Sequence, residues 1–192
     1  MSAIIEGYFD TNTGAMSPAL LNSGVSGATS SKADTITVEL HDAVTGTLNG
    51  TAKGVLLTNG NLSTPLSFTY YNPSTPKYIV LKGRNMIETW SASPVTMGLS
   101  TSYDFTNLAT KAYGSNMIEV APGKWACRSG DVNQDGVIEG SDYLQMENDL
   151  SGTILFGYYV TDLNGDGVVE GADYLMMENQ LSGAIIFALR PF

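Results

Sequence analysis

The feature that most constrains this chain is an internal repeat in its last third. GDVNQDGVIEGSDYLQMENDLSG begins at Gly130, and TDLNGDGVVEGADYLMMENQLSG begins at Thr161, 31 residues later. Self-similarity at a fixed offset is the signature of a duplicated structural unit. The chain therefore contains two copies of one small motif, and we expect both copies to fold in the same way.

Each copy fits the twelve-residue loop that binds calcium. Calcium takes six to eight oxygen ligands, and such a loop supplies them from positions 1, 3, 5, 7, 9 and 12. Gly136 and Gly167 occupy position 6, where the backbone turns too sharply for a Cβ. The predicted ligands are Asp131, Asn133, Asp135, the Val137 carbonyl, Glu139 (directly or through water) and Asp142 in the first loop, and Asp162, Asn164, Asp166, the Val168 carbonyl, Glu170 and Asp173 in the second.

A single cluster of Asp, Asn and Gly would be an ordinary turn, but two copies in register favour a metal site. The carboxylates gathered in each loop would repel one another without a cation. The number of ligands disfavours magnesium, which demands near-ideal octahedral geometry. The sequence therefore predicts two bound calcium ions.

A helix is predicted after each loop, over residues 141–150 and 172–181. Apolar residues recur there at spacings of three, four and seven, which is typical of one helix face. We interpret this face as core packing in preference to partner contact. Each helix is expected to end near Ser151-Gly152 or Ser182-Gly183, because glycine often follows a helix. The residues of the predicted face are Tyr143, Leu144, Met146 and Leu150, and Tyr174, Leu175, Met177 and Leu181.

Residues 129–190 resemble a dockerin, the calcium-dependent module that docks into cohesin domains. The resemblance rests on DVNQDGVIEGSD and DLNGDGVVEGAD, including Asp rather than Glu at loop position 12. It implies a small α module with two EF-hand-like loops and a cohesin-like β-sandwich as partner. It also implies that loop positions 10 and 11 contact the partner. These positions hold Gly140, Ser141, Gly171 and Ala172, which differ from the Ser-Thr pairs of cellulosomal dockerins.

The charge distribution divides the chain into two parts. Residues 1–128 carry eight acidic and eight basic side chains, whereas residues 129–192 carry eleven acidic side chains and one arginine. This asymmetry predicts two domains, 1–128 and 129–192. The acidic part repels nucleic acid and suits cations. We expect no membrane span, because no uncharged apolar stretch reaches about 18 residues, and the first residues lack the pattern of a signal peptide.

The neutral part is predicted to be a β-sandwich of about seven strands. Ile36, Val38 and Leu40 alternate with polar residues, as in a strand with one buried face. Further short runs are separated by turn signals at Gly46, Gly60 and Asn72-Pro73-Ser74; they span residues 3–9, 54–57, 66–71, 78–83 and 86–92. The pattern resembles the prealbumin-like or carboxypeptidase-regulatory sandwiches of secreted bacterial proteins. Together with the dockerin-like module, this resemblance implies an extracellular or cell-surface location.

No catalytic constellation is apparent in the sequence. His41 and Asp42 are adjacent on a predicted strand, so they face opposite ways. The single Cys127 has no partner for a disulfide and no activating histidine nearby in sequence. A nucleophile, base and oxyanion hole are not assembled, and we predict a protein that is not an enzyme.

Two questions about aromatic residues stay open at this stage. Trp125 could be a wedge between the two domains or a core residue of the last strand. Exposed aromatics could form a sugar-binding platform, although in a sandwich they more often pack in the core. The candidates for this platform are Tyr70, Tyr71, Trp90 and Tyr103.

The predicted function is a non-catalytic, extracellular module for calcium-dependent protein–protein interaction and assembly. The partner would be a cohesin-like sandwich in trans, or the N-terminal domain of another copy. The second version is a head-to-tail contact that grows into a fibre if it does not close. The alternative function is carbohydrate binding by the sandwich in adhesion, with calcium only structural.

Overall fold

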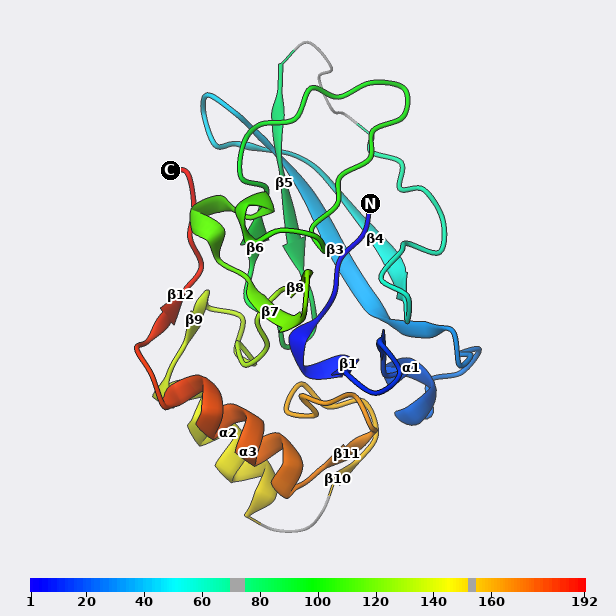
Figure 1. Ribbon diagram of the computed structural model, residues 1–192, viewed down its shortest axis with the longest axis vertical. Helices are drawn as coiled ribbons and strands as arrows, with labels where there is room; N and C mark the ends of the chain where they lie inside the picture. Colours follow the sequence, from blue (N-terminus) through cyan, green and yellow to red (C-terminus); the bar gives the residue numbers. More distant parts are fainter. Residues whose placement is uncertain (70–74, 152–154) are drawn as a thin grey trace.

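The computed structural model describes residues 1–69, 75–151 and 155–192. A mainly β part precedes a C-terminal part whose two long helices lie side by side at the end farthest from the large sheet (Figure 1). Among the described residues, no helix is long and apolar enough to cross a membrane.

The largest element is an antiparallel sheet of four strands in the order β4-β3-β5-β6. Ile36, Val38 and Leu40 on β3 are buried, which confirms the alternating pattern. The predicted strands at 54–57 and 78–83 are also confirmed, as parts of β4 and β5. The strands of this sheet are β3 (Lys32–Asp42), β4 (Leu48–Leu57), β5 (Lys77–Lys82) and β6 (Thr89–Trp90).

The rest of the N-terminal part consists of short elements joined by irregular segments. Two strand pairs are β1 (Phe9–Asp10) with β2 (Ala15–Met16), and β7 (Ile118–Ala121) with β8 (Lys124–Ala126). The helical turns are η1 (Glu6–Tyr8), α1 (Ala19–Asn22), η2 (Ala109–Lys111) and η3 (Tyr113–Ser115). The prediction of a mainly β domain is therefore confirmed.

The predicted sandwich of about seven regular strands does not match this architecture. The segment 86–92 contributes only the two residues of β6, and residues 66–69 form no strand, while Tyr70, Tyr71 and the turn at 72–74 lie outside the described residues. In segment 3–9, Ile5 forms an isolated bridge, residues 6–8 form the turn η1, and Phe9 begins β1. Gly7 lies so close to the C-terminal part that a Cβ would be 2.1 Å from the Leu163 carbonyl oxygen.

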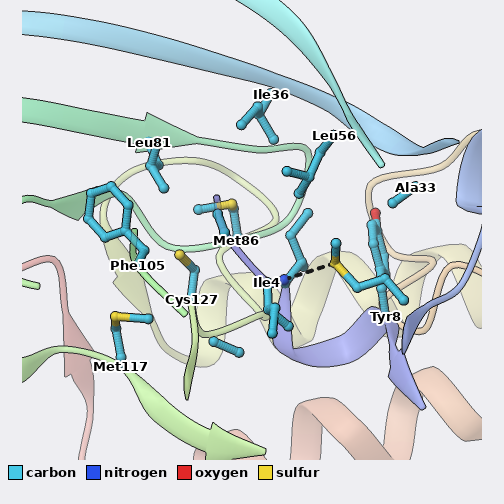
Figure 2. Packing of buried hydrophobic residues seen from close by; sticks show 14 of the residues in the cluster. Ile4, Tyr8, Ala33, Ile36, Leu56, Leu81, Met86, Phe105, Met117 and Cys127 are labelled. Atoms are coloured by element: carbon cyan, nitrogen blue, oxygen red, sulfur yellow. Dashed lines mark hydrogen bonds between the residues drawn. The ribbon is translucent and has the colours of Figure 1, made fainter. Parts of the chain in front are cut away.

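The core of the N-terminal part lies between the four-stranded sheet and the N-terminal segment. Figure 2 shows Ile36, Leu56 and Leu81 from the sheet facing Ile4 and the neighbouring residues. The segment is held in place by backbone bridges, with Ile5 beside Cys127 and Ser2 beside Asp104. The second layer of this domain is therefore built from bridged irregular chain.

The C-terminal part keeps the repeat in three dimensions. The helices α2 (Gly140–Leu150) and α3 (Gly171–Leu181) follow the two loops, which confirms the predicted helices. Each loop ends in a short strand that pairs with the strand following the helix of the other repeat. The pairs are β9 (Val137–Ile138) with β12 (Ile186–Phe187), and β11 (Val168–Val169) with β10 (Leu155–Phe156).

The predicted apolar helix face needs one correction. Met146 and Met177 are fully buried, but Leu144 and Leu175 are 56% and 57% exposed. A residue advances about 100° around a helix, so Leu144 lies about 160° from Met146 and points away from the core. The helices end at Leu150 and Leu181, and Ser151 and Ser182 follow, whereas Gly152 lies outside the described residues.

The two parts are in contact through Ile87 rather than through Trp125. Ile87 is fully buried in the core of the C-terminal part, with Met146, Met177 and Leu163. The residue before it, Met86, belongs to the core of the N-terminal part (Figure 2). Trp125 packs against the N-terminal core, which favours its interpretation as a core residue over that of a wedge.

Candidate calcium-binding loops and docking surface

The first loop turns side-chain oxygens inward. Asp131 Oδ2 accepts a hydrogen bond from the Gly136 amide at 3.1 Å, and Asn133 Oδ1 accepts from the Asp135 amide at 2.9 Å. Gly136 has a φ of +88°, as the sharp turn at position 6 requires. Asp131 Oδ1 is buried and has no hydrogen-bond partner within the described part of the chain. A buried anionic oxygen without a partner is costly, and a cation at this position would remove that cost.

The second loop repeats this geometry. Asp162 Oδ2 accepts from the Gly167 amide at 3.2 Å, and Asn164 Oδ1 accepts from the Asp166 amide at 2.8 Å. Gly167 has a φ of +86°. The two loops therefore share one fold, as their sequences predict.

The carboxylates at position 12 join each loop to its helix. Asp142 Oδ1 accepts from the Val132 and Asn133 amides at 2.9 and 3.2 Å, and its Oδ2 accepts from the Glu139 amide at 3.0 Å. Asp173 repeats this arrangement in the second loop. Among the described residues, no group of three Asp, Glu, His or Cys side chains is arranged as a metal cluster.

Electrostatics favours a cation in both loops. Burial, followed by the charge of Asp142, raises the pKa of Asp131 to about 6. Burial also raises the pKa of Asp162 to about 6, against the opposing charge of Arg84. The pKa values of Asp142 and Asp173 are raised too, mainly by burial. Arg84 offsets only part of this effect at Asp162, and a bound cation would supply further positive charge to both loops.

The residues present therefore fit calcium. Hard oxygen donors and a glycine at position 6 are what a calcium loop requires. The first loop also has an unpartnered carboxylate oxygen, whereas Asp162 Oδ1 in the second loop accepts from the Gly165 amide at 2.8 Å. The ion would be held in the first loop by Asp131, Asn133, Asp135, Val137, Glu139 and Asp142, and in the second by Asp162, Asn164, Asp166, Val168, Glu170 and Asp173. When bound, it neutralises the carboxylates and fixes each loop against the helix that follows.

The residues predicted to contact a partner lie on the surface, where the two helices begin. Gly140, Ser141, Gly171 and Ala172 are all exposed. A Cβ built at Gly140 or Gly171 would meet no atom of the described residues within 4 Å. Leu144 and Leu175 are exposed one helical turn further along. We call these six residues of α2 and α3 the docking surface: Gly140, Ser141, Leu144, Gly171, Ala172 and Leu175.

The equivalence of the two helices extends to their contact with each other. The Tyr143 and Tyr174 hydroxyls bond to one another, and the centroids of the two rings lie 5.3 Å apart. These residues occupy the same position in the two repeats. The docking surface therefore presents two similar halves, one from each repeat.

Two loop-and-helix repeats around a shared core define the C-terminal part as a duplicated loop–helix module. Residues 129–182 match the family model of the dockerin type I domain, so this segment is similar to dockerin modules. Dockerin modules bind calcium and mediate protein–protein assembly, and they occur in extracellular or cell-surface bacterial proteins. The match covers well under half of the chain. No curated protein and no solved structure matches the chain.

The candidate sugar-binding aromatics do not form an exposed platform among the described residues. Trp90 is only 6% exposed and packs against His41, Tyr78 and Phe192. Tyr103 is tilted against Phe105 with its ring centroid 4.7 Å away. The other two candidates, Tyr70 and Tyr71, lie outside the described residues.

The groups considered for catalysis are engaged elsewhere. His41 Nε2 lies 2.9 Å from Glu39 Oε2, and Asp42 accepts a hydrogen bond from Lys77 at 2.9 Å. Cys127 is fully buried, and burial raises the pKa of its thiol to about 12. A thiol in this state is a poor nucleophile.

Three further residues of this site, Arg84, Asn85 and Asn22, could not be predicted from the sequence. All three belong to the N-terminal part and contact the second calcium loop. They stand in neutral segments far from the loops in sequence and belong to no motif. Only the tertiary structure brings them to the site.

A matched pair of glycines provides a first test of this site. Gly136→Ala and Gly167→Ala place a methyl group at the same loop position and the same φ, with an expected strain of roughly 1–2 kcal/mol each. At Gly167 the new Cβ would also lie 2.3 Å from the Asn22 carbonyl oxygen, whereas at Gly136 it would meet the flexible end of Arg190 at 2.9 Å. In saturating calcium, the midpoint of thermal unfolding should therefore fall further for Gly167→Ala than for Gly136→Ala. Equal losses would contradict the structure around the second loop.

Proposed function

We propose that this protein is a non-catalytic, extracellular assembly module whose docking surface binds a cohesin-like β-sandwich of another protein in the presence of calcium. The observation that carries the proposal is the pair of exposed leucines, Leu144 and Leu175, at equivalent positions of the two helices. They stand beside Gly140, Ser141, Gly171 and Ala172, the loop positions through which a dockerin is expected to contact its partner. The match of residues 129–182 to dockerins supports the same function.

Calcium would control this surface through the helix starts. Asp142 and Asp173 are the last residues of the loops and also lie in the first turns of α2 and α3. An ion bound in each loop would fix both helices relative to the loops and to each other. Without the ions, repulsion among the loop carboxylates would loosen the arrangement that the partner recognises.

A partner in trans is the version we propose. The N-terminal part of this chain has one four-stranded sheet and bridged irregular chain opposite it. It therefore lacks the two regular sheets of a cohesin-like sandwich among its described residues, and a second copy offers a poorer partner than a separate sandwich domain.

The test is binding to a panel of purified cohesin domains, measured by surface plasmon resonance in calcium and in chelator. Because the two repeats are similar, the variant should carry both Leu144→Asp and Leu175→Asp. We expect at least about a thirtyfold loss of affinity, the effect of removing a central apolar contact. Leu108→Asp is the matched control, since Leu108 is 54% exposed but belongs to the N-terminal part.

Three results would contradict the proposal. If the affinity for a cohesin were the same in calcium and in chelator, the ion would have no role in binding. Unchanged binding by the double variant would move the contact away from the docking surface. The third result has two parts: the chain binds no cohesin, and alone it forms calcium-dependent polymers in size-exclusion chromatography. This result would favour self-association over a partner in trans.

A further inference from the structure

The two calcium loops have almost the same sequence but different surroundings. In the second loop, Asp162, Leu163 and Gly165 are fully buried or nearly so against the N-terminal part. In the first loop, Asp131 and Val132 are likewise buried, but Gln134 is exposed. The difference is largest at loop position 4, which is Gln134 in the first loop and Gly165 in the second.

This position decides how the carbonyl oxygen at loop position 1 is bonded. In the first loop, the Gln134 side chain donates to the Asp131 carbonyl oxygen, so the loop satisfies this group itself. Gly165 has no side chain, and the corresponding Asp162 carbonyl oxygen accepts instead from Asn85 Nδ2, at 2.8 Å. An amide from the N-terminal part thus replaces an amide of the loop.

A second asparagine acts on the same loop. Asn22 Nδ2 donates to the Gly165 carbonyl oxygen at 2.8 Å, so positions 1 and 4 of the loop are both held by the N-terminal part. Asn85 is itself fixed, because it is fully buried and its carbonyl oxygen accepts from the Gly130 amide at 2.7 Å. These hydrogen bonds restrict the loop backbone in the folded module.

Arg84 adds a contact to the ligand side chain. Its Nη2 lies 3.5 Å from Asp162 Oδ2, the oxygen that also accepts from the Gly167 amide. The guanidinium is closer to Asp34, with Nε 3.1 Å from Asp34 Oδ2. The guanidinium therefore pairs with both carboxylates, Asp34 more closely than Asp162.

We propose that Asn85 and Asn22 are positioning residues that hold the second calcium loop in its binding conformation, which couples calcium binding at this loop to packing of the C-terminal part on the N-terminal part. The inference rests on the proposed calcium binding and adds an asymmetry between the two sites. The second loop binds calcium in a conformation held by the other domain, whereas the first loop supplies the equivalent hydrogen bond from Gln134. By linkage, calcium in the second loop strengthens the contact between the domains.

The test uses the full chain and a separate signal from each loop. The backbone amides of Gly136 and Gly167, which donate to the position 1 carboxylates, are followed by NMR during a titration with calcium. Asn85→Ala should raise the calcium midpoint at Gly167 about tenfold, the usual scale for losing a group that orients a metal ligand. The midpoint at Gly136 should not change.

Asn116→Ala is the matched control. Asn116 Nδ2 also donates to a backbone carbonyl across the same interface, that of Phe187 at 3.0 Å, but it does not bond to a loop residue. We expect this variant to leave both midpoints unchanged. If Asn85→Ala fails to fold, Asn22→Ala provides the test, because Asn22 is more exposed than Asn85. We expect it to raise the calcium midpoint at Gly167 by a smaller factor.

The inference is overturned if the folded variants shift neither midpoint, or shift both equally. An equal effect of Asn116→Ala would also overturn it, because the cause would then be general loosening of the interface. A wild-type chain that binds no calcium in either loop would instead contradict the proposed function.

Discussion

Removing calcium from the full chain is expected to unfold residues 129–192 while the four-stranded sheet stays folded. Seven buried residues form the core of this module, and Ile87, one of them, comes from the N-terminal part. So small a unit without a disulfide usually needs an added staple. At calcium concentrations about a thousandfold above the dissociation constant, each bound ion would contribute about 4 kcal/mol to the stability of the module.

The measurement is far-ultraviolet circular dichroism together with amide hydrogen exchange. In excess chelator, helical signal and amide protection should be lost over 141–150 and 172–181, while protection persists in β3 and β5. Replacing Asp131 and Asp162 together by Ala should reproduce this loss in the presence of calcium. Asp10→Ala, a change of a half-buried residue of β1 in the N-terminal part, should not.

Removing Arg84 is expected to destabilise the contact between the domains strongly. In Arg84→Met, Asp34 stays buried without the cation that lies 3.1 Å away in the native chain. Breaking a buried ion pair from one side costs about 3–5 kcal/mol. The midpoint of thermal unfolding should fall by on the order of 10 °C for a chain of this size.

A second substitution tests whether the unpaired charge is the cause. Asp34→Asn removes that charge and keeps an oxygen to accept from the Tyr8 hydroxyl, which bonds to Asp34 at 2.7 Å. Arg84→Met combined with Asp34→Asn should therefore recover most of the lost stability. The control is Lys82→Met, which removes a more exposed cation paired with Glu39 and Glu88 and should cost less than about 1 kcal/mol. A double variant no more stable than Arg84→Met would contradict the explanation.

The calcium loops and helices could be predicted because the residues that determine each of them are close together in the sequence. The spacing of Asp131, Asn133 and Asp135, with Gly136 after them, follows from the geometry of one ion, and the duplication repeats it. The helices follow from apolar spacing alone. Leu144 was misassigned because it was grouped with Tyr143, its neighbour, although one residue along a helix already rotates the side chain by about 100°.

The N-terminal part was harder to predict because its second layer depends on distant contacts. Segment 3–9 contains the β-favouring run Ile4-Ile5, yet it bends at Gly7 to pass close to Leu163. The hydrogen bonds that hold the second loop could not be predicted for the same reason. The replacement of Gln134 by Gly165 can be seen by aligning the two repeats, but the amide that takes its place comes from Asn85, 77 residues before Asp162 in the chain.

The most direct test of the central claim is a calorimetric titration of the chelated full chain with calcium, with circular dichroism recorded on the same samples. The account predicts two ions bound per chain, with recovery of the helical signal as the sites fill. Absence of binding, a single ion at saturation with both loops intact, or binding without any change in the helices would contradict it.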